Sequence, residues 1–122
     1  VVELLLAASG IGINQAKTDN GCTPLYMACQ EGHAPVVELL LASSDIDVNQ
    51  HDTQNVTPLN IASDNGHVEV VRLLLQQPNI DLNKKDDWND SPLDAARKKR
   101  TPGVAFDDHT EIVQLLVNAG AQ

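Results

Sequence analysis

Apolar residues gather in four short runs that recur along the chain, each broken by one polar residue in its third position. The runs VVELLL, VVELLL, VVRLLL and IVQLLV occupy Val1–Leu6, Val36–Leu41, Val70–Leu75 and Ile112–Val117. Apolar residues grouped in this way, with polar stretches between the groups, favour amphipathic helices that bury one face. We therefore expect a helix at each run, with its apolar stripe turned toward a neighbour.

A second motif precedes each of the last three runs. It is Thr-Pro-Leu at Thr23–Leu25 and Thr57–Leu59 and Ser-Pro-Leu at Ser91–Leu93, and successive copies lie 34 residues apart. Threonine and serine hydroxyls cap helix N-termini, and proline fits the first helical position because it has no N–H to satisfy there. Gly32 and Gly66 suit the left-handed end of such a helix. Each motif therefore predicts a short first helix.

A third landmark is an asparagine that closes an extended segment after the apolar run. The segments IGIN, IDVN and IDLN end at Asn14, Asn49 and Asn83, and a polar turn follows each one. The repeating unit is therefore helix, turn, helix and a hairpin-like finger. One such unit cannot bury its apolar face alone, so neighbouring units must stack. Stacked units present an elongated concave surface without a deep pocket, which favours binding of proteins over processing of small molecules.

This order of landmarks resembles the ankyrin repeat, and the resemblance covers essentially the whole chain. It implies an all-α solenoid of helix-turn-helix units with hairpin-like fingers, with about 3.5 repeats in a single domain over residues 1–122. We expect a half repeat at 1–14, complete repeats at 15–49 and 50–83, and a last repeat at 84–122. Because the chain starts without methionine and in the middle of a repeat, we expect it to be part of a longer protein.

Two departures from the family pattern change the expectations. The family usually has histidine after Thr-Pro-Leu, whereas this chain has Tyr26, Asn60 and Asp94. A histidine-mediated hydrogen bond to the cap hydroxyl is therefore in doubt. The last repeat also contains eight inserted residues, for which we predict an enlarged loop near 100–108 between its two helices.

Composition and charge restrict the classes of partner that the chain can bind. The aromatic residues are Tyr26, Trp88 and Phe106, although 42% of the chain is hydrophobic, so the core must be aliphatic. The net charge of −9 opposes contact with phosphate backbones and anionic lipids. No apolar run approaches the ~20 residues that span a bilayer. We therefore expect no general nucleic-acid binding, no membrane insertion, and an intracellular, cytoplasmic location with the nucleus as the alternative.

One basic cluster, Arg97–Arg100, interrupts the acidic background. Residues 84–122 carry six bases and seven acids, whereas residues 1–83 carry two bases and ten acids. The simplest interpretation is a solvated helix end, where bases also favour the helix dipole. The alternatives are a contact with an acidic partner, a nuclear-import signal and a contact with nucleic acid.

Residues capable of chemistry do not form a recognisable catalytic or metal-binding pattern. Cys22 and Cys29 lie seven residues apart, which is neither a CxxC pair nor a zinc spacing. His33, His67 and His109 occupy the same repeat position, and stacked units would hold them ~10 Å apart. We therefore expect structural histidines, no catalysis, no metal, no cofactor and no small-molecule substrate.

The resemblance implies that a partner contacts the finger tips and the exposed end of each first helix. These positions are Asp19, Asn20, Cys22, Gln30 and Glu31 in the first complete repeat, Thr53, Gln54, Val56, Asp64 and Asn65 in the second, and Asp87, Trp88, Asp90, Lys98 and Lys99 in the last. Because these positions are mostly polar and acidic in the two complete repeats, we predict a partner protein with a basic or mixed face. Cys22, beside the cap residue, is expected to be partly exposed.

Trp88 has two interpretations. A tryptophan exposed at a finger tip is a natural binding anchor, whereas one folded onto the neighbouring finger would be structural. The function that we expect is a non-catalytic protein–protein interaction module. The alternatives are a targeting or scaffold segment of a larger multidomain enzyme, such as a kinase, or of a ubiquitin-ligase adaptor, and a nucleic-acid contact through residues 97–100.

Overall fold

The computed structural model describes residues 14–16, 20–99 and 107–121. Six helices lie in this part of the chain, and it contains no strand. They are α2 (Pro24–Glu31), α3 (Ala34–Leu41), α4 (Pro58–Asp64), α5 (Val68–Leu75), α6 (Pro92–Lys99) and α7 (Asp108–Ala119). The predicted half repeat, apart from Asn14, and most of the predicted loop near 100–108 lie outside the described residues.

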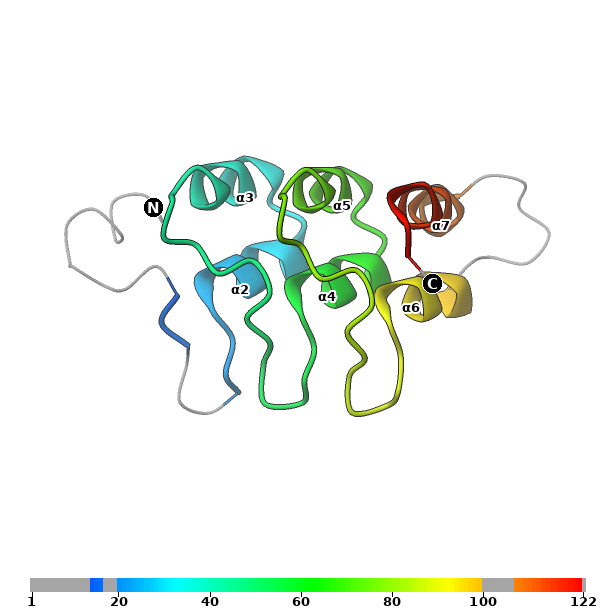
Figure 1. The fold of residues 1–122 in the computed structure, drawn as a ribbon, viewed down its shortest axis with the longest axis horizontal. Coiled ribbons are helices and arrows are strands. Elements are labelled where there is room, and N and C mark those ends of the chain that lie inside the picture. The colour runs from blue at the N-terminus through cyan, green and yellow to red at the C-terminus, as the bar shows by residue number, and fades with distance from the viewer. Residues whose placement is uncertain (1–13, 17–19, 100–106, 122) are drawn as a thin grey trace.

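The helices form two rows (Figure 1). The inner helices α2, α4 and α6 stand side by side in one row, and the outer helices α3, α5 and α7 stand in the other. Each inner helix contacts the outer helix of its own pair, α4 packs against α2 and α6, and α5 packs against α3 and α7. The fingers extend beyond the inner row. This arrangement confirms the predicted all-α solenoid.

Each inner helix begins at the predicted cap. The Thr23 hydroxyl accepts a hydrogen bond from the backbone N–H of Tyr26 at 3.1 Å, and the Thr57 hydroxyl accepts one from Asn60 at 3.1 Å. The Ser91 hydroxyl accepts one from the Asp94 N–H at 3.2 Å. A proline follows each cap residue as the first residue of the helix, as expected where the helix needs no N–H.

Asn60 and Asp94 complete two of the caps in the place where the family has histidine. The Thr57 hydroxyl donates to Oδ1 of Asn60 at 2.9 Å. Oδ2 of Asp94 accepts from both the N–H and the hydroxyl of Ser91, each at 3.1 Å, which is a reciprocal capping arrangement. The Ser91 N–H lowers the pKa of the Asp94 carboxyl because it stabilises the charged form. The cap hydroxyl is therefore bonded without a histidine.

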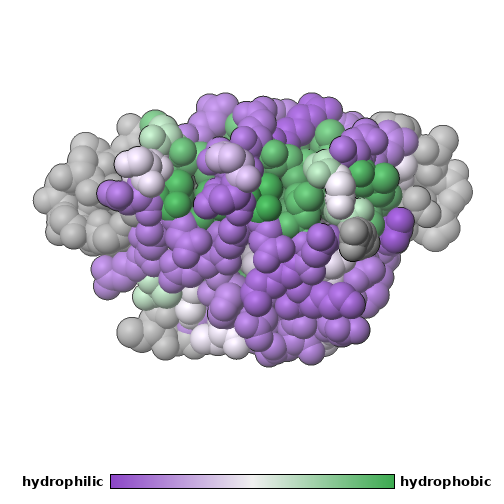
Figure 2. Space-filling model, in the orientation of Figure 1, coloured by the Kyte–Doolittle hydropathy of each residue, from purple (hydrophilic) through white to green (hydrophobic). Residues whose placement is uncertain are grey.

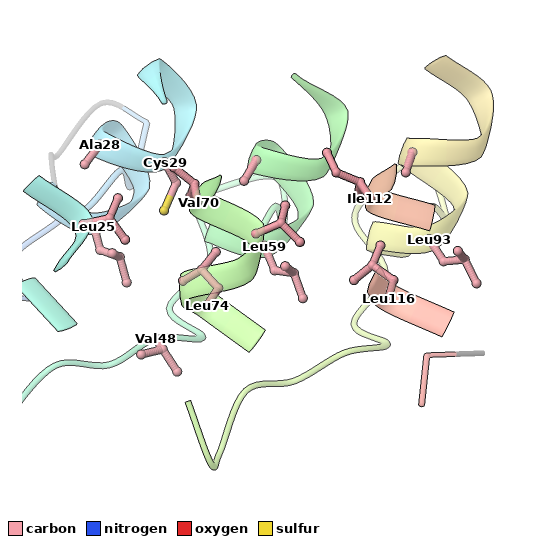
Figure 3. Close-up of a cluster of buried hydrophobic side chains, with 14 of the residues drawn as sticks. Leu25, Ala28, Cys29, Val48, Leu59, Val70, Leu74, Leu93, Ile112 and Leu116 are labelled. Carbon is pink, nitrogen blue, oxygen red and sulfur yellow. The ribbon is translucent and has the colours of Figure 1, made fainter. Parts of the chain in front are cut away.

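Aliphatic side chains from both rows form one continuous core (Figure 3). The inner helices contribute leucines at equivalent positions, and the outer helices contribute the buried faces of the apolar runs. The fully buried members include Leu25, Leu59, Val37, Leu40, Val71, Leu74, Ile112 and Leu116. Burying a side chain of this size stabilises the fold by about 1.5–3 kcal/mol. The core therefore runs through all three helix pairs instead of lying inside any one.

Two histidines join neighbouring repeats, as expected for a structural role. Nε2 of His67 lies 3.0 Å from the Gln30 carbonyl oxygen, and Nε2 of His109 lies 3.0 Å from that of Asp64. The His67 ring lies directly over Gly32, at the end of α2. Each ring thus ties the start of an outer helix to the end of the preceding inner helix. The structural role predicted for His67 and His109 is confirmed.

The asparagines that close the extended segments make a second set of links between repeats. Nδ2 of Asn49 donates to the Asn79 carbonyl at 2.8 Å, and Oδ1 of Asn49 accepts from the Asp81 N–H at 2.8 Å. Asn14 makes the same pair of bonds to Asp45 and Asp47. Each amide therefore holds the backbone of the next repeat by both a donor and an acceptor.

Gly32→Ala should destabilise the protein by about 2 kcal/mol or more, because the left-handed φ alone costs about 1–2 kcal/mol for a residue with Cβ. Gly32 has a φ of +73°, and a Cβ there would lie 2.5 Å from Nδ1 of His67. Gly120→Ala is the matched control, since Gly120 has a φ of +105° and nothing within 4 Å of its Cβ position. Thermal unfolding of both variants checks this. A loss for Gly32→Ala no larger than the ~1–2 kcal/mol of the backbone conformation alone would contradict the clash with His67.

Asn49→Ala should lower the free energy of unfolding by about 1–2 kcal/mol, since two hydrogen bonds between repeats are lost. Asn79→Ala is the control, because the bond to Asn79 uses its backbone carbonyl, which alanine keeps. Urea denaturation measures both. A loss for Asn79→Ala as large as that for Asn49→Ala would contradict the role given to the Asn49 amide.

Candidate functional site

The second finger (residues 50–57) and the third finger (residues 84–91) have tips of the same construction. Oδ1 of Asp52 accepts from the N–H groups of Gln54 and Val56 at 2.8 and 3.0 Å. Oδ1 of Asp86 accepts from the N–H groups of Trp88 and Asp90 at 2.9 and 3.0 Å. The aspartate at the base of each tip thus fixes the turn, which presents Gln54 and Trp88 at equivalent places.

Neighbouring fingers are hydrogen-bonded to each other. The Thr53 N–H donates to the Asn20 carbonyl at 3.1 Å, and the Asp87 N–H donates to the Gln54 carbonyl at 3.0 Å. Nδ2 of Asn55 also donates to Oδ1 of Asp87 at 2.7 Å. The tips therefore form one ridge across the repeats. Figure 2 shows polar residues over this part of the molecule, in the lower half of the view.

Trp88 projects from the ridge with 59% of its surface exposed. The other large hydrophobic residues with comparable exposure in the described chain are Leu39 and Val117, on the outer helices α3 and α7. This exposure agrees with the interpretation of Trp88 as a binding anchor, and the binding itself stays a prediction.

The predicted partner-contact residues differ in their exposure. The exposed ones are Asn20, Glu31, Thr53, Gln54, Asn65, Asp87, Trp88, Lys98 and Lys99. Gln30, Asp64 and Asp90 are partly buried, and Asp19 lies outside the described residues.

The structure corrects the expectation for two of the predicted positions. Cys22 is 6% exposed and Val56 is 8% exposed, and both are buried with Tyr26 in a small cluster beneath the fingers. Each follows a residue with positive φ at the finger tip, and its side chain packs under the finger against the inner helix. The sequence contained a signal for this burial, because an apolar or thiol side chain stands directly before the cap residue in both repeats. Neither side chain belongs to the exposed surface.

A hollow of about 300 Å³ lies between the second and third fingers. The second finger contributes Gln54 and Val56 to its lining, and the third contributes Asp86, Trp88 and Asp90. Asp90 stands 34 residues after Val56. A carboxylate therefore lines the hollow at the position where the second finger has a buried apolar side chain.

Inner helices form the rest of this hollow. Ile61 and Asp64 line it from α4, together with Asn60, and Ala95 lines it from α6. Ala95 stands 34 residues after Ile61, so the last repeat has a smaller side chain at this position. The alanine in place of isoleucine leaves more space in the hollow beside α6. Sequence analysis did not single out Asp86, Ile61 or Ala95, and the alanine in place of isoleucine was the signal that could have indicated them.

Tyr26 is a fixed part of the same lining. Its side chain is 5% exposed, and its hydroxyl lies near the Asp52 carboxylate. Burial, followed by the nearby Asp52 carboxylate, raises the pKa of the Tyr26 phenol. The phenol therefore stays neutral, and its ring packs with Val56 in the small buried cluster.

Two lysines of the basic cluster pair with acids at the hollow. Nζ of Lys98 lies 2.6 Å from Oδ1 of Asp90, and Nζ of Lys99 lies 3.8 Å from Oδ1 of Asp64. The hydrogen bond to Asp90 raises the pKa of Lys98. Both lysine side chains remain exposed, at 63% and 54%. Part of the positive charge of the cluster is thus balanced within the chain, and Arg100 lies outside the described residues.

The described residues contain no group of three or more histidine, cysteine or carboxylate side chains arranged to hold a metal ion. Cys22 and Cys29 are free and buried, and burial raises the pKa of the Cys29 thiol to about 12. A buried neutral thiol is a poor nucleophile. Among the helices of the described chain, none has the length and apolar character that a bilayer crossing requires.

Comparison with known proteins identifies the family. A family model described as ankyrin repeats (3 copies) matches residues 1–86. A search of curated proteins gave no match. The matched segment ends within the third finger, and the two helices beyond it, α6 and α7, pack on α4 and α5 in the same two rows. The chain belongs to the ankyrin-repeat family.

Proposed function

We propose that this chain is a non-catalytic protein-binding module whose partner contacts the finger ridge and the neighbouring inner helices. Ankyrin repeats are generally protein–protein interaction modules and are typically non-catalytic. The observation that carries the proposal is the exposure of Trp88 on a ridge whose tips are hydrogen-bonded to one another. A surface already held in place loses little entropy on binding.

The proposed partner has a basic or mixed face. The net charge of the chain is −9, and Asp64, Asp86 and Asp90 line the hollow beside Trp88. The strongest basic feature of the sequence, the 97–100 cluster, places two of its lysines against two of these acids. Complementary charge raises the rate of encounter and selects among partners.

A targeting or scaffold segment of a larger protein would use the same surface. That alternative concerns the protein in which the module stands and leaves its contacts unchanged.

A nucleic-acid contact through residues 97–100 has less support. Lys98 and Lys99 lie beside carboxylates, so Asp64 and Asp90 would repel a phosphate backbone that approached them.

The test uses peptides selected by display of a random peptide library on the intact 122-residue chain. The selected peptides should carry a net positive charge, and Asp87→Lys at the finger tip should weaken their binding about tenfold or more, as expected at a contact worth 1.4 kcal/mol or more. Glu38→Lys is the matched control, because Glu38 is exposed on the outer helix α3 and the change in charge is the same. Fluorescence anisotropy measures the affinities.

Weakening by Glu38→Lys as large as that by Asp87→Lys would place binding elsewhere. Selection of acidic peptides, or recovery of no peptide, would also contradict the proposal. Thermal melts of both variants check that each remains folded, since Asp87→Lys also removes the bond from Asn55.

A further inference from the structure

We propose that the hollow between the second and third fingers is the receptor for one arginine side chain of the partner. This inference rests on the proposed protein-binding function and names the group that the surface recognises. The volume of the hollow is about 300 Å³, at the lower end of the range for sites that enclose a whole drug-sized ligand. A single long side chain entering from a partner suits this size.

Trp88 supplies a stacking face at the edge of the hollow. Its side chain is 59% exposed, while its backbone is held by the bond from its N–H to Asp86 at 2.9 Å. The adjacent Asp87 N–H is bonded to the Gln54 carbonyl of the second finger. The indole is therefore carried on a fixed turn, and guanidinium groups stack on tryptophan faces with favourable cation–π attraction.

Three carboxylates surround the same space. Asp64, Asp86 and Asp90 line the hollow, and no lysine, arginine or histidine is among its lining residues in the described chain. Asp64 contacts Lys99 through its Oδ1, and Asp90 contacts Lys98 through its Oδ1. Asp86 accepts the hydrogen bonds of the third-finger turn through its Oδ1 as well. A carboxylate has two oxygens with about four acceptor sites, so each aspartate keeps capacity to accept from an incoming cation.

The apolar part of the lining favours a side chain with a hydrocarbon stem. Val56, Ile61 and Ala95 line the hollow together with the acids, so methylene groups of arginine can pack on them while its head remains hydrogen-bonded. The guanidinium presents five N–H donors in a planar fork, which suits carboxylates on two sides and an indole face together. An ammonium group offers neither the planar face nor the fork.

Lys98 and Lys99 act as internal competitors for this site. Both reach acids of the hollow from α6, and both side chains are more than half exposed. Exposed ion pairs of this kind are weak because solvent screens them, so an arriving arginine can displace them. Removing Lys98 should therefore strengthen binding of the cationic ligand. A lysine that itself contacted the ligand would not give this result.

The experiment is an NMR titration of the intact chain with the blocked pentapeptide Gly-Ser-Arg-Ser-Gly. The reporters are the Trp88 indole N–H and the backbone amides of Ile61 and Ala95. Matched peptides carry lysine or citrulline in place of arginine. Citrulline keeps the shape of arginine without its charge. We expect saturable shifts with arginine, binding at least threefold weaker with lysine, and no saturable shift with citrulline.

Two variants make the test specific to the hollow. Trp88→Ala should abolish saturation at the Ile61 and Ala95 amides, whereas Leu39→Ala, which removes another exposed apolar side chain, should leave it unchanged. Lys98→Gln should tighten arginine binding roughly two- to fivefold, which corresponds to the loss of one exposed ion pair. Unchanged melting temperatures for Trp88→Ala and Lys98→Gln would show that the effects are not due to unfolding.

Several results would overturn the inference. Equal affinity for the arginine and citrulline peptides would remove the role of charge, and shifts confined to the outer helices would place binding elsewhere. Weaker binding by Lys98→Gln would make Lys98 a contact instead of a competitor. If the titration fails while selected peptides still depend on Asp87, the hollow is excluded and the protein-binding function stands. The reverse result would retain the arginine site and reject the finger ridge as the general partner surface.

Discussion

In the described chain, the apolar faces of each helix pair are covered by the neighbouring pairs. Leu59 on α4 and Val71 on α5 are fully buried, and the helices that carry them pack against neighbours on both sides. The core is therefore shared along the row and belongs to no single repeat. Links by His67 and by Asn49 add hydrogen bonds across the same boundaries. The contacts between repeats therefore both stabilise the fold and fix how neighbouring repeats align.

This constraint also determines what the binding surface can be. Because the inner helices are held in one row, the fingers emerge side by side and bond to each other through the Thr53 and Asp87 N–H groups. The surface is formed before any partner arrives, so little ordering entropy opposes binding. The proposed arginine receptor is a local variation on this regular surface, where Asp90 and Ala95 stand at positions that hold Val56 and Ile61 one repeat earlier.

The fold was predictable because its signals are local and repeated. The capping roles of Thr23 and Thr57 follow from residue type and spacing, and the structure confirms them. The surface was less accessible, because it depends on where side chains turn once the fingers have folded. The burial of Val56 depends on the finger geometry beneath the tip. The pairing of Lys98 with Asp90 depends on a helix approaching a finger, which spacing does not reveal.

Native-state hydrogen exchange on the intact chain tests most directly whether neighbouring repeats hold each other in place. In the described chain α4 and α5 have packed neighbours on both sides, whereas α6 and α7 have them on one side. The account predicts that the slowest amides lie in α4 and α5 and that those of α6 and α7 exchange through smaller, local openings. Protection greatest in α6 and α7 would contradict the account, because the pair with neighbours on one side would then be more stable than the pair packed on both sides.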